Sequence, residues 1–347
     1  MKNFAKLTML GLLLAAVLGM GACQSDQPTI NVFNWGYFIY PPVLAMFEDE
    51  TGIRVVYEEY DSNEAMYARV LQGGSDFDVL FPSEYMIERM INQGMLAQLN
   101  WDNIPYASHI DERFWDMPHD PRNLYSVPYM WGTFGILYNT TMVTEPVYSW
   151  NVLWDEQYAN QIFMYNASRD SMGVALKRLG FSLNSTNIAE IEAARDSLIE
   201  QMPLVRAYLG DPMRDRMVTG DGALGVIYSG DALWAIEDNP DLNFVVPIEG
   251  TQLFLDSMVI PATTTRQEYA EAFINFMTRP DIAYLNTRFI MYSTTNATTF
   301  DMLPDYMRNC PIYWTPDYLF DNLESFVDLG DFKETFERAW TEVLASR

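Results

Sequence analysis

Cysteine, histidine and basic residues are all scarce in this sequence of 347 residues, and each shortage excludes a class of site or partner. Two cysteines and two histidines are too few for a multi-cysteine metal site. The 21 Lys and Arg residues are outnumbered by 47 Asp and Glu residues, which gives a formal net charge of −26. Because such a surface repels nucleic acid and anionic lipid headgroups, we expect no nucleic-acid partner, whereas a cationic ligand would be attracted.

The sequence also lacks a membrane-spanning run, since no segment after residue 22 approaches the roughly 20 apolar residues that a transmembrane helix needs. At the N-terminus, two lysines precede the apolar stretch 7–20, and small residues lie directly before Cys23. This order is typical of a bacterial lipoprotein signal. Residues 1–22 are therefore predicted to be cleaved and Cys23 to carry lipid, with 23–28 as a tether in the periplasm or on the outer face of the cytoplasmic membrane. An ordinary signal peptide is the alternative.

Lipid on Cys23 would leave Cys310 as the only other cysteine, which excludes an intramolecular disulfide. The stability of the folded chain must then come from its apolar core. With 49% hydrophobic residues, the chain has enough apolar material for two domains of ordinary size.

Short apolar stretches alternate with helical patterns in the first third of the chain. Pro41 and Pro42 begin the first helical stretch and Gly52 ends it, as helix geometry prefers. The alternation predicts a βαβαβ unit with a parallel sheet. The predicted strands are 30–33, 53–57 and 78–81, and the predicted helices begin at Pro41, Ser62 and Pro82 and end at Gly52, Leu71 and Gly94.

The same alternation returns later, after two extended stretches, 125–128 and 135–139, that are candidates for chain crossings between lobes. We therefore predict an α/β fold with two lobes around a cleft, in which ligands bind beyond the carboxyl ends of the strands. The later predicted helices are 171–179, 188–201 and 231–237, and the later predicted strands are 205–209, 224–228 and 242–246.

Asp256 is the most informative carboxylate, because it lies within the apolar run 253–260, which is predicted to be a buried strand. An unpaired charge there would cost several kcal/mol even after relaxation. Lys and Arg are scarce, so a ligand cation is a reasonable partner. Asp170 and Asp231 give weaker signals, because each stands at a helix start, where Asp commonly caps exposed amides.

Aromatic and hydroxyl side chains follow several of the predicted strands. They include the stretch 34–38 after the first strand, Ser83 and Tyr85 after the third, and Tyr228 with Asp231 after the strand that ends at 228. A single aromatic residue is more often part of the core than of a binding site. The repetition of the pattern after separate strands favours a site at that edge of the sheet.

The sequence resembles a known family, the spermidine/putrescine-binding proteins of bacterial ABC importers. The similarity runs in order through nearly all of the chain after the signal, and no single motif decides it. The motifs that carry it are 34–39 (NWGYFI), 51–57 (TGIRVVY), 62–68 (SNEAMYA), 82–85 (PSEY), 125–132 (YSVPYMWG), 149–150 (SW), 153–154 (LW), 175–180 (ALKRLG), 249–250 (EG), 256–257 (DS), 274–276 (INF) and 279–281 (RPD).

The resemblance implies a periplasmic-binding-protein type II fold with a polyamine between the lobes. The first lobe would take 29–133 and 256–300, and the second 134–255 and 301–347. The protein would be a monomer that closes on its ligand and is recognised by a permease, with no cofactor, metal or catalytic residue. The ligand-binding residues carried over are Trp35, Tyr37, Phe38, Ser83, Tyr85, Tyr228, Phe254 and Tyr292, with Asp170, Asp231 and Asp256 as the anions.

Several positions depart from the family pattern. Tyr37 and Ala167 stand where relatives carry acids, and Tyr228 and Phe254 stand where the spermidine binder has tryptophans. The loss of two acids favours putrescine, a diamine, and leaves spermidine open. The same scaffold binding another small amine or a sugar is an alternative, and a lipid-anchored hydrolase that works through paired carboxylates is a more remote one.

Overall fold

The computed structural model describes residues 27–73, 76–210, 212–320 and 322–347. The predicted signal peptide, Cys23 and most of the predicted tether lie outside these ranges. Within them, no helix has both the length and the apolar character that crossing a membrane requires. The strands are β1 (Thr29–Trp35), β2 (Arg54–Tyr60), β3 (Val79–Leu80), β4 (Ser126–Asn139), β5 (Ile162–Tyr165), β6 (Val205–Leu209), β7 (Leu224–Tyr228), β8 (Leu242–Val245), β9 (Leu253–Val259) and β10 (Ser293–Thr294).

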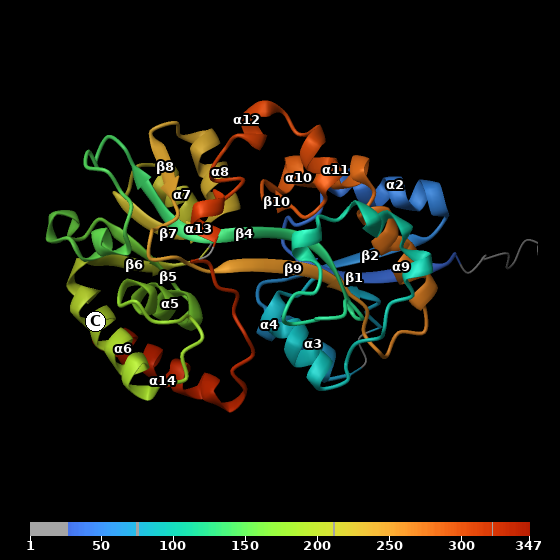
Figure 1. The fold of residues 1–347 in the computed structure, drawn as a ribbon, viewed down its shortest axis with the longest axis horizontal. Coiled ribbons are helices and arrows are strands. Elements are labelled where there is room, and N and C mark those ends of the chain that lie inside the picture. The colour runs from blue at the N-terminus through green and yellow to red at the C-terminus, as the bar shows by residue number, and fades with distance from the viewer. Residues whose placement is uncertain (1–26, 74–75, 211, 321) are drawn as a thin grey trace, which may run out of the picture.

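Helices cover both faces of the strands (Figure 1). Their starts and ends follow local rules: Ser62 accepts the Ala65 amide at the start of the second helix, and Gly52 adopts φ +72° after the first. The helices are α2 (Pro41–Thr51), α3 (Asn63–Leu71), α4 (Glu84–Asn92), α5 (Ser168–Arg178), α6 (Ile188–Gln201), α7 (Pro212–Val218), α8 (Ser229–Asp238), α9 (Gln267–Met277), α10 (Pro280–Ile290), α11 (Ala297–Met302), α12 (Asp305–Arg308), α13 (Asp317–Phe320) and α14 (Lys333–Ala345).

The sheet order is β2-β1-β3-β9-β4-β7-β5-β6, with β8 and β10 also paired to β4. β1 pairs in parallel with β2 and β3, as the βαβαβ pattern predicted, and β5 pairs in parallel with β6 and β7. β4 and β9 are antiparallel to each other and lie between these two parallel groups. The α/β prediction is confirmed.

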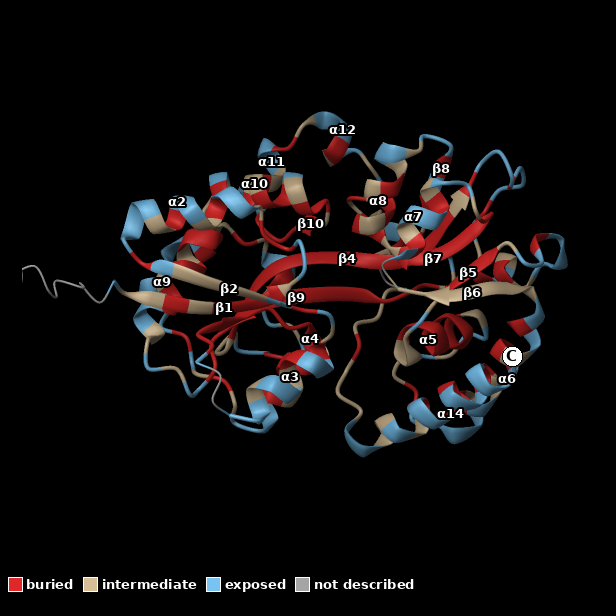
Figure 2. Ribbon diagram, turned by 180° about the vertical axis from the view of Figure 1, so that it is seen from behind, coloured by how far each residue is buried: buried red, intermediate tan, exposed pale blue. Residues whose placement is uncertain are grey.

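β4 corrects one expectation, because the two extended stretches predicted around 125–139 are parts of one strand of 14 residues. Its first half pairs with β9 and its second half with β7 and β8, so it joins the second parallel group directly and the first through β9 (Figure 1). Both β4 and β9 are buried along almost their whole length (Figure 2). A strand buried on both faces is apolar without alternation, which hid the continuity of this one from the period-two pattern.

The region where β4 and β9 pass between the two parallel groups is called the junction here. A set of buried side chains lies on each side of it. The first core group contains Phe47, Phe81, Trp131 and Phe273. The second core group contains Phe134, Trp150 and Phe336, so α14 packs with it. Trp131 and Phe134 are three residues apart on β4, and they belong to different groups.

β4 and β9 are two chain connections between the two parts of the molecule. Residues 322–329, which lie beside β9, form a third connection, and we call them the third crossing segment. Its Glu324 carbonyl accepts the Leu253 amide at 3.0 Å, and Ser325 Oγ donates to the Leu253 carbonyl at 2.9 Å. This segment contacts both core groups, because Leu323 packs against the first and Leu329 against the second. Just before it, the Phe320 ring lies 5.8 Å from the ring of Trp131 in the first core group.

Two local features were missed from sequence. β5 has four residues and too few apolar positions to show a period. α5 begins at Ser168, before the predicted 171, because its first turn is polar and carries no apolar periodicity. The capping interpretation of Asp170 therefore needs adjustment: the residue lies inside the first turn of α5, after the N-cap residue Ala167.

Gly250 allows the close approach of the third crossing segment to the chain just before β9. It has φ +87°, and a Cβ there would stand 1.9 Å from the Asn322 carbonyl oxygen. Gly250→Ala is expected to lower the free energy of unfolding by about 3 kcal/mol, from left-handed strain plus overpacking. Chemical denaturation measures this.

Gly220→Ala is the matched control, because Gly220 has φ +73° with nothing within 4 Å of the built Cβ. It should cost only the backbone strain, about 1 kcal/mol. Equal losses for the two variants would contradict the role assigned to Gly250.

Candidate functional site

Three helices that begin just after strands carry many of the predicted site residues. α4, α5 and α8 follow β3, β5 and β7, and their N-cap residues Ser83, Ala167 and Tyr228 make no side-chain capping hydrogen bond. Helix N-termini carry partial positive charge. Asp170 and Asp231 lie in the first turns of α5 and α8, where they offset that charge.

Each of the three predicted carboxylates accepts a hydrogen bond from a predicted hydroxyl group. Ser83 Oγ donates to Asp256 Oδ1 at 2.6 Å. Tyr228 Oη donates to Asp170 Oδ1 at 2.5 Å, and Tyr292 Oη donates to Asp231 Oδ2 at 2.8 Å. The sequence prediction named all six of these residues, and the structure brings them together in these pairs.

Two of these carboxylates are buried without a basic partner. Asp256 is 5% exposed and Asp170 is 9% exposed. Among the described residues, Lys and Arg form no ion pair with either acid; pairs such as Lys177–Glu324 and Arg266–Asp78 lie elsewhere. The partner that the sequence required for Asp256 is thus a serine hydroxyl, which leaves the negative charge uncompensated.

Burial shifts the protonation of both acids. Loss of hydration raises the pKa of Asp256 to about 7, although the hydrogen bond from Ser83 opposes the shift. Burial likewise raises the pKa of Asp170 to about 6, against the hydrogen bond from Tyr228 and the positive charge of Arg169. Each acid therefore gains from a cation that stabilises its ionised form.

Aromatic rings form a continuous row beside the acids. Phe38 and Tyr292 have ring centroids 6.0 Å apart, Tyr292 and Phe254 are 5.2 Å apart, and Phe254 and Tyr228 are 5.4 Å apart. Successive rings meet edge to face, the geometry that aromatic pairs prefer. Gly230 makes the row possible, because a Cβ there would stand 2.5 Å from the Tyr292 ring.

Three other predicted residues lie outside the aromatic row and the carboxylate–hydroxyl pairs. Trp35 Nε1 donates to the Phe81 carbonyl at 2.8 Å. Tyr85 joins Ser83 through Asn63, whose Nδ2 is 3.1 Å from Tyr85 Oη and 3.0 Å from Ser83 Oγ. Tyr37 stands apart, since it is 79% exposed with φ +57°.

Other residues of the site were not predicted. Asn63 lay in a quoted motif without an assigned role. Tyr165, at the end of the missed strand β5, has its ring 5.5 Å from that of Tyr228, and Gln252 Oε1 accepts from Tyr228 Oη at 3.3 Å. No sequence signal marks Gln252, whereas recognition of β5 would have placed Tyr165 at the edge of the sheet that holds the site.

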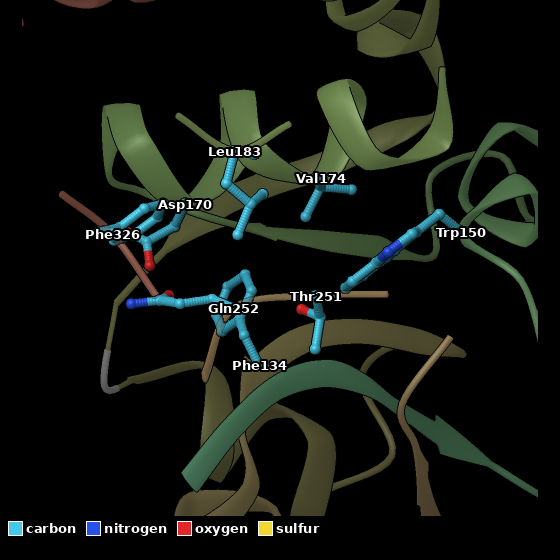
Figure 3. A pocket seen from close by; sticks show the side chains of 9 residues that line it. Phe134, Trp150, Asp170, Val174, Leu183, Thr251, Gln252 and Phe326 are labelled. Carbon is cyan, nitrogen blue, oxygen red and sulfur yellow. The ribbon is translucent and has the colours of Figure 1, made fainter. Parts of the chain in front are cut away.

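A small hollow of about 190 Å³, which includes open solvent, borders Asp170. Figure 3 shows Asp170 and Gln252 side by side at one end of it and Trp150 at the other. Its remaining walls are mostly apolar, and they include Phe134, Val174, Leu183 and Phe326. Within the described ranges, His, Cys, Asp and Glu side chains form no group of three that could hold a metal ion. Carboxylates beside aromatic faces are suited to an organic cation.

Known proteins are similar to this chain in sequence and fold. Residues 43–305 match the family model of bacterial extracellular solute-binding proteins. The chain is 33% identical over 337 residues to the spermidine/putrescine-binding periplasmic protein of Salmonella typhimurium, covering 96% of this chain and 97% of that one. It is 29% identical to the putrescine-binding periplasmic protein SpuD of Pseudomonas aeruginosa, covering 100% of both.

A solved structure of a similar protein shows the same fold as this chain. The spermidine/putrescine ABC transporter substrate-binding protein PotD of Streptococcus pneumoniae is 36% identical, with a TM-score of 0.85 over 92% of this chain and 99% of that one. The predicted periplasmic-binding-protein type II fold is thereby confirmed.

The stability of the ligand-free protein should depend on the protonation of Asp256. Its pKa is about 7 in the folded protein and near 3.8 in the unfolded chain, so the folded state binds more protons between these values. The free energy of unfolding should therefore fall as pH rises from 4 to 7, by up to about 1.4 kcal/mol per pH unit for this group.

Asp256→Asn should make this fall shallower and leave the melting temperature at pH 7 no lower than that of the unmodified protein. Denaturant unfolding at several pH values tests the slope. An unchanged slope, or a large loss of melting temperature at pH 7, would show that Asp256 is a structural residue.

Proposed function

The chain belongs to the bacterial extracellular solute-binding proteins, and we propose that it captures a polyamine, putrescine or spermidine, and delivers it to an ABC importer. The observation that carries the proposal is the set of carboxylate–hydroxyl pairs beside a row of aromatic rings, with Asp170 and Asp256 buried and without basic partners. Relatives named for spermidine and putrescine support the choice of ligand.

The chemistry of the ligand fits these groups. An ammonium group has three donors, and an ionised carboxylate offers about four acceptor positions, of which one hydroxyl takes one. Charge-assisted hydrogen bonds would hold the amines, and aromatic faces attract cations by about 0.5–2 kcal/mol each. The methylene groups of the ligand would lie along the row formed by Phe38, Tyr292, Phe254 and Tyr228.

Capture would require the two parts of the molecule to separate and close. The ligand-binding groups are buried where the parts meet, so a ligand reaches them only after separation. We propose 29–133 with 256–300 as one lobe and 134–255 with 301–347 as the other; α14, which packs in the second core group, supports the latter assignment. A ligand that binds the closed form better shifts the equilibrium toward the shape that the permease recognises.

Putrescine is the ligand we favour. Tyr37 and Ala167 supply no carboxylate where relatives have acids. A triamine would therefore need all three of the remaining carboxylates, Asp170, Asp231 and Asp256, whereas a diamine needs only two. Another small amine or a sugar remains the alternative ligand class. Members of this family bind solutes, which contradicts the expectation of a lipid-anchored hydrolase.

Calorimetric titration tests the ligand class. The lipid-free chain from Gln24, unfolded and refolded to remove any bound ligand, should bind putrescine or spermidine one to one. Asp256→Asn and Asp170→Asn should each weaken binding about 100-fold, as the loss of a charged hydrogen bond worth 2–3 kcal/mol implies. Asp221→Asn, in a surface ion pair with Arg206, is the control and should bind normally.

Absence of heat with putrescine, cadaverine, spermidine and spermine would refute the polyamine assignment. Binding of a sugar with an affinity independent of Asp256 and of salt would favour the alternative ligand class.

We further propose that the protein acts as a monomer tethered outside the cytoplasmic membrane by lipid on Cys23. In a bacterial host, the unmodified protein should sediment with membranes and incorporate labelled fatty acid. Cys23→Ser should abolish the label and shift the protein to the soluble extracytoplasmic fraction or leave its precursor uncleaved. Continued fatty-acid labelling of that variant would contradict lipidation at Cys23.

A further inference from the structure

Glu84 lies in the quoted motif 82–85, but it was given no role and is not part of the proposed ligand site. It occupies an unusual position at the junction of the two parts. It is the first residue of α4 and is 1% exposed. Its Oε2 accepts the Leu255 amide of β9 at 3.0 Å, and its Oε1 accepts the Phe326 amide of the third crossing segment at 3.2 Å. One carboxylate thus holds two of the chain connections between the core groups.

The amides along one edge of β9 explain this position. The Ser257 amide donates to the Pro82 carbonyl, beside α4, and the Leu253 amide donates to the Glu324 carbonyl of the third crossing segment. Leu255 lies between them, where the backbone partner of β9 changes. The Leu255 amide donates to the Glu84 carboxylate instead of to a backbone carbonyl. The side chain thus takes the place of one backbone acceptor along this edge of β9.

The ligand site lies directly beside this junction. Ser83 and Tyr85 flank Glu84 in the sequence, and Phe254 and Asp256 flank Leu255. α4 also contacts the third crossing segment through Glu88, whose Oε2 accepts the Asp328 amide at 2.9 Å. From the side of α5, the Arg169 guanidinium stacks 4.3 Å from the centroid of the Phe326 ring.

On the premise of the proposed function, we propose that Glu84 is a positioning residue that couples occupation of the ligand site to the hinge. It contacts no ligand itself. By tying β9 and the third crossing segment to α4, it sets the placement of Asp256 and Phe254 relative to Ser83 and Tyr85 when the lobes close.

The charge on Glu84 supports this coupling. Burial is the main cause that raises its pKa to about 8; the amides of Leu255 and Phe326 oppose the rise, and the negative charge of Asp256 contributes to it. The other titratable groups near it are the Arg169 guanidinium on α5, the Tyr85 hydroxyl on α4, whose pKa burial raises well above its usual range, and Glu88 on α4, while Glu324 of the third crossing segment pairs with Lys177. A ligand cation at Asp256 removes the repulsion, so Glu84 should release its proton and accept both amides more strongly.

The test compares Glu84→Gln with Glu271→Gln. A glutamine at 84 can accept only one of the two amides and cannot ionise. Glu271 is a matched control: it is also 1% exposed and accepts the Asn100 amide at 2.9 Å and Asn103 Nδ2 at 2.6 Å, but it contacts no interlobe connection. Putrescine and spermidine are titrated calorimetrically at pH 7.5 in two buffers of different ionisation enthalpy, which yields affinity and protons released.

We expect Glu84→Gln to bind about 10-fold more weakly than Glu271→Gln and to release fewer protons on binding. Glu84→Asp, which keeps the charge on a shorter side chain, should recover the proton release and part of the affinity, and it carries the test if Glu84→Gln does not fold. Equal affinity and equal proton release in the Glu84 and Glu271 variants would overturn the inference. Failure of the unmodified protein and of Glu271→Gln to bind either polyamine would instead overturn the proposed function.

Discussion

Carboxylates held in the interior without basic partners are the constraint on which this structure depends. Burial of Asp170 and Asp256 raises the pKa of each, and a single hydroxyl group satisfies only part of the acceptor capacity of each ion. A core built for stability alone would avoid such groups. Their placement is understandable if a cation from solution completes the site, and the aromatic row beside them offers that cation a favourable surface.

The proposed ligand site and the proposed hinge are built from the same short stretches of chain. Along β9, Phe254 and Asp256 face the site, while Leu255 and its neighbours on that edge donate to the groups that join the two parts. Along the start of α4, Ser83 and Tyr85 serve the site while Glu84 holds the junction. In these two stretches each proposed ligand contact is next in sequence to a residue that holds the junction, so local shifts at the proposed site would act directly on the connections.

The residues that the structure brings together were predicted partly from local signals and partly from the family resemblance, which alone supplied Phe254 and Tyr292. Asp256 was recognisable as a charge within a buried strand, and the residues after β1, β3 and β7 were recognisable from strand ends. Asp170 and Asp231 could not be distinguished from ordinary acids at helix starts, because both do lie in the first turn of a helix. Their role depends on hydroxyls supplied by Tyr228 and Tyr292, residues 58 and 61 positions away in the chain.

What the sequence could not provide were contacts made by tertiary structure alone. The continuity of β4 was hidden by burial on both faces, and β5 was too short to show a period. Glu84 looked like any acid in the first turn of a helix, since nothing local reveals that two distant amides point at it. Tyr37, which was predicted to bind ligand and stands where relatives carry an acid, lies exposed on a loop with positive φ.

The central claim is that the buried carboxylates recognise a cation, and a carbon-13 NMR titration of the Asp170 and Asp256 carboxyl carbons tests it directly. In the refolded, ligand-free protein, the two groups should titrate near their raised pKa values of about 6 and about 7. With putrescine at saturation, both pKa values should fall toward or below the ordinary range of an aspartate. Unchanged titration of both carboxyl groups in the presence of bound ligand would contradict the account.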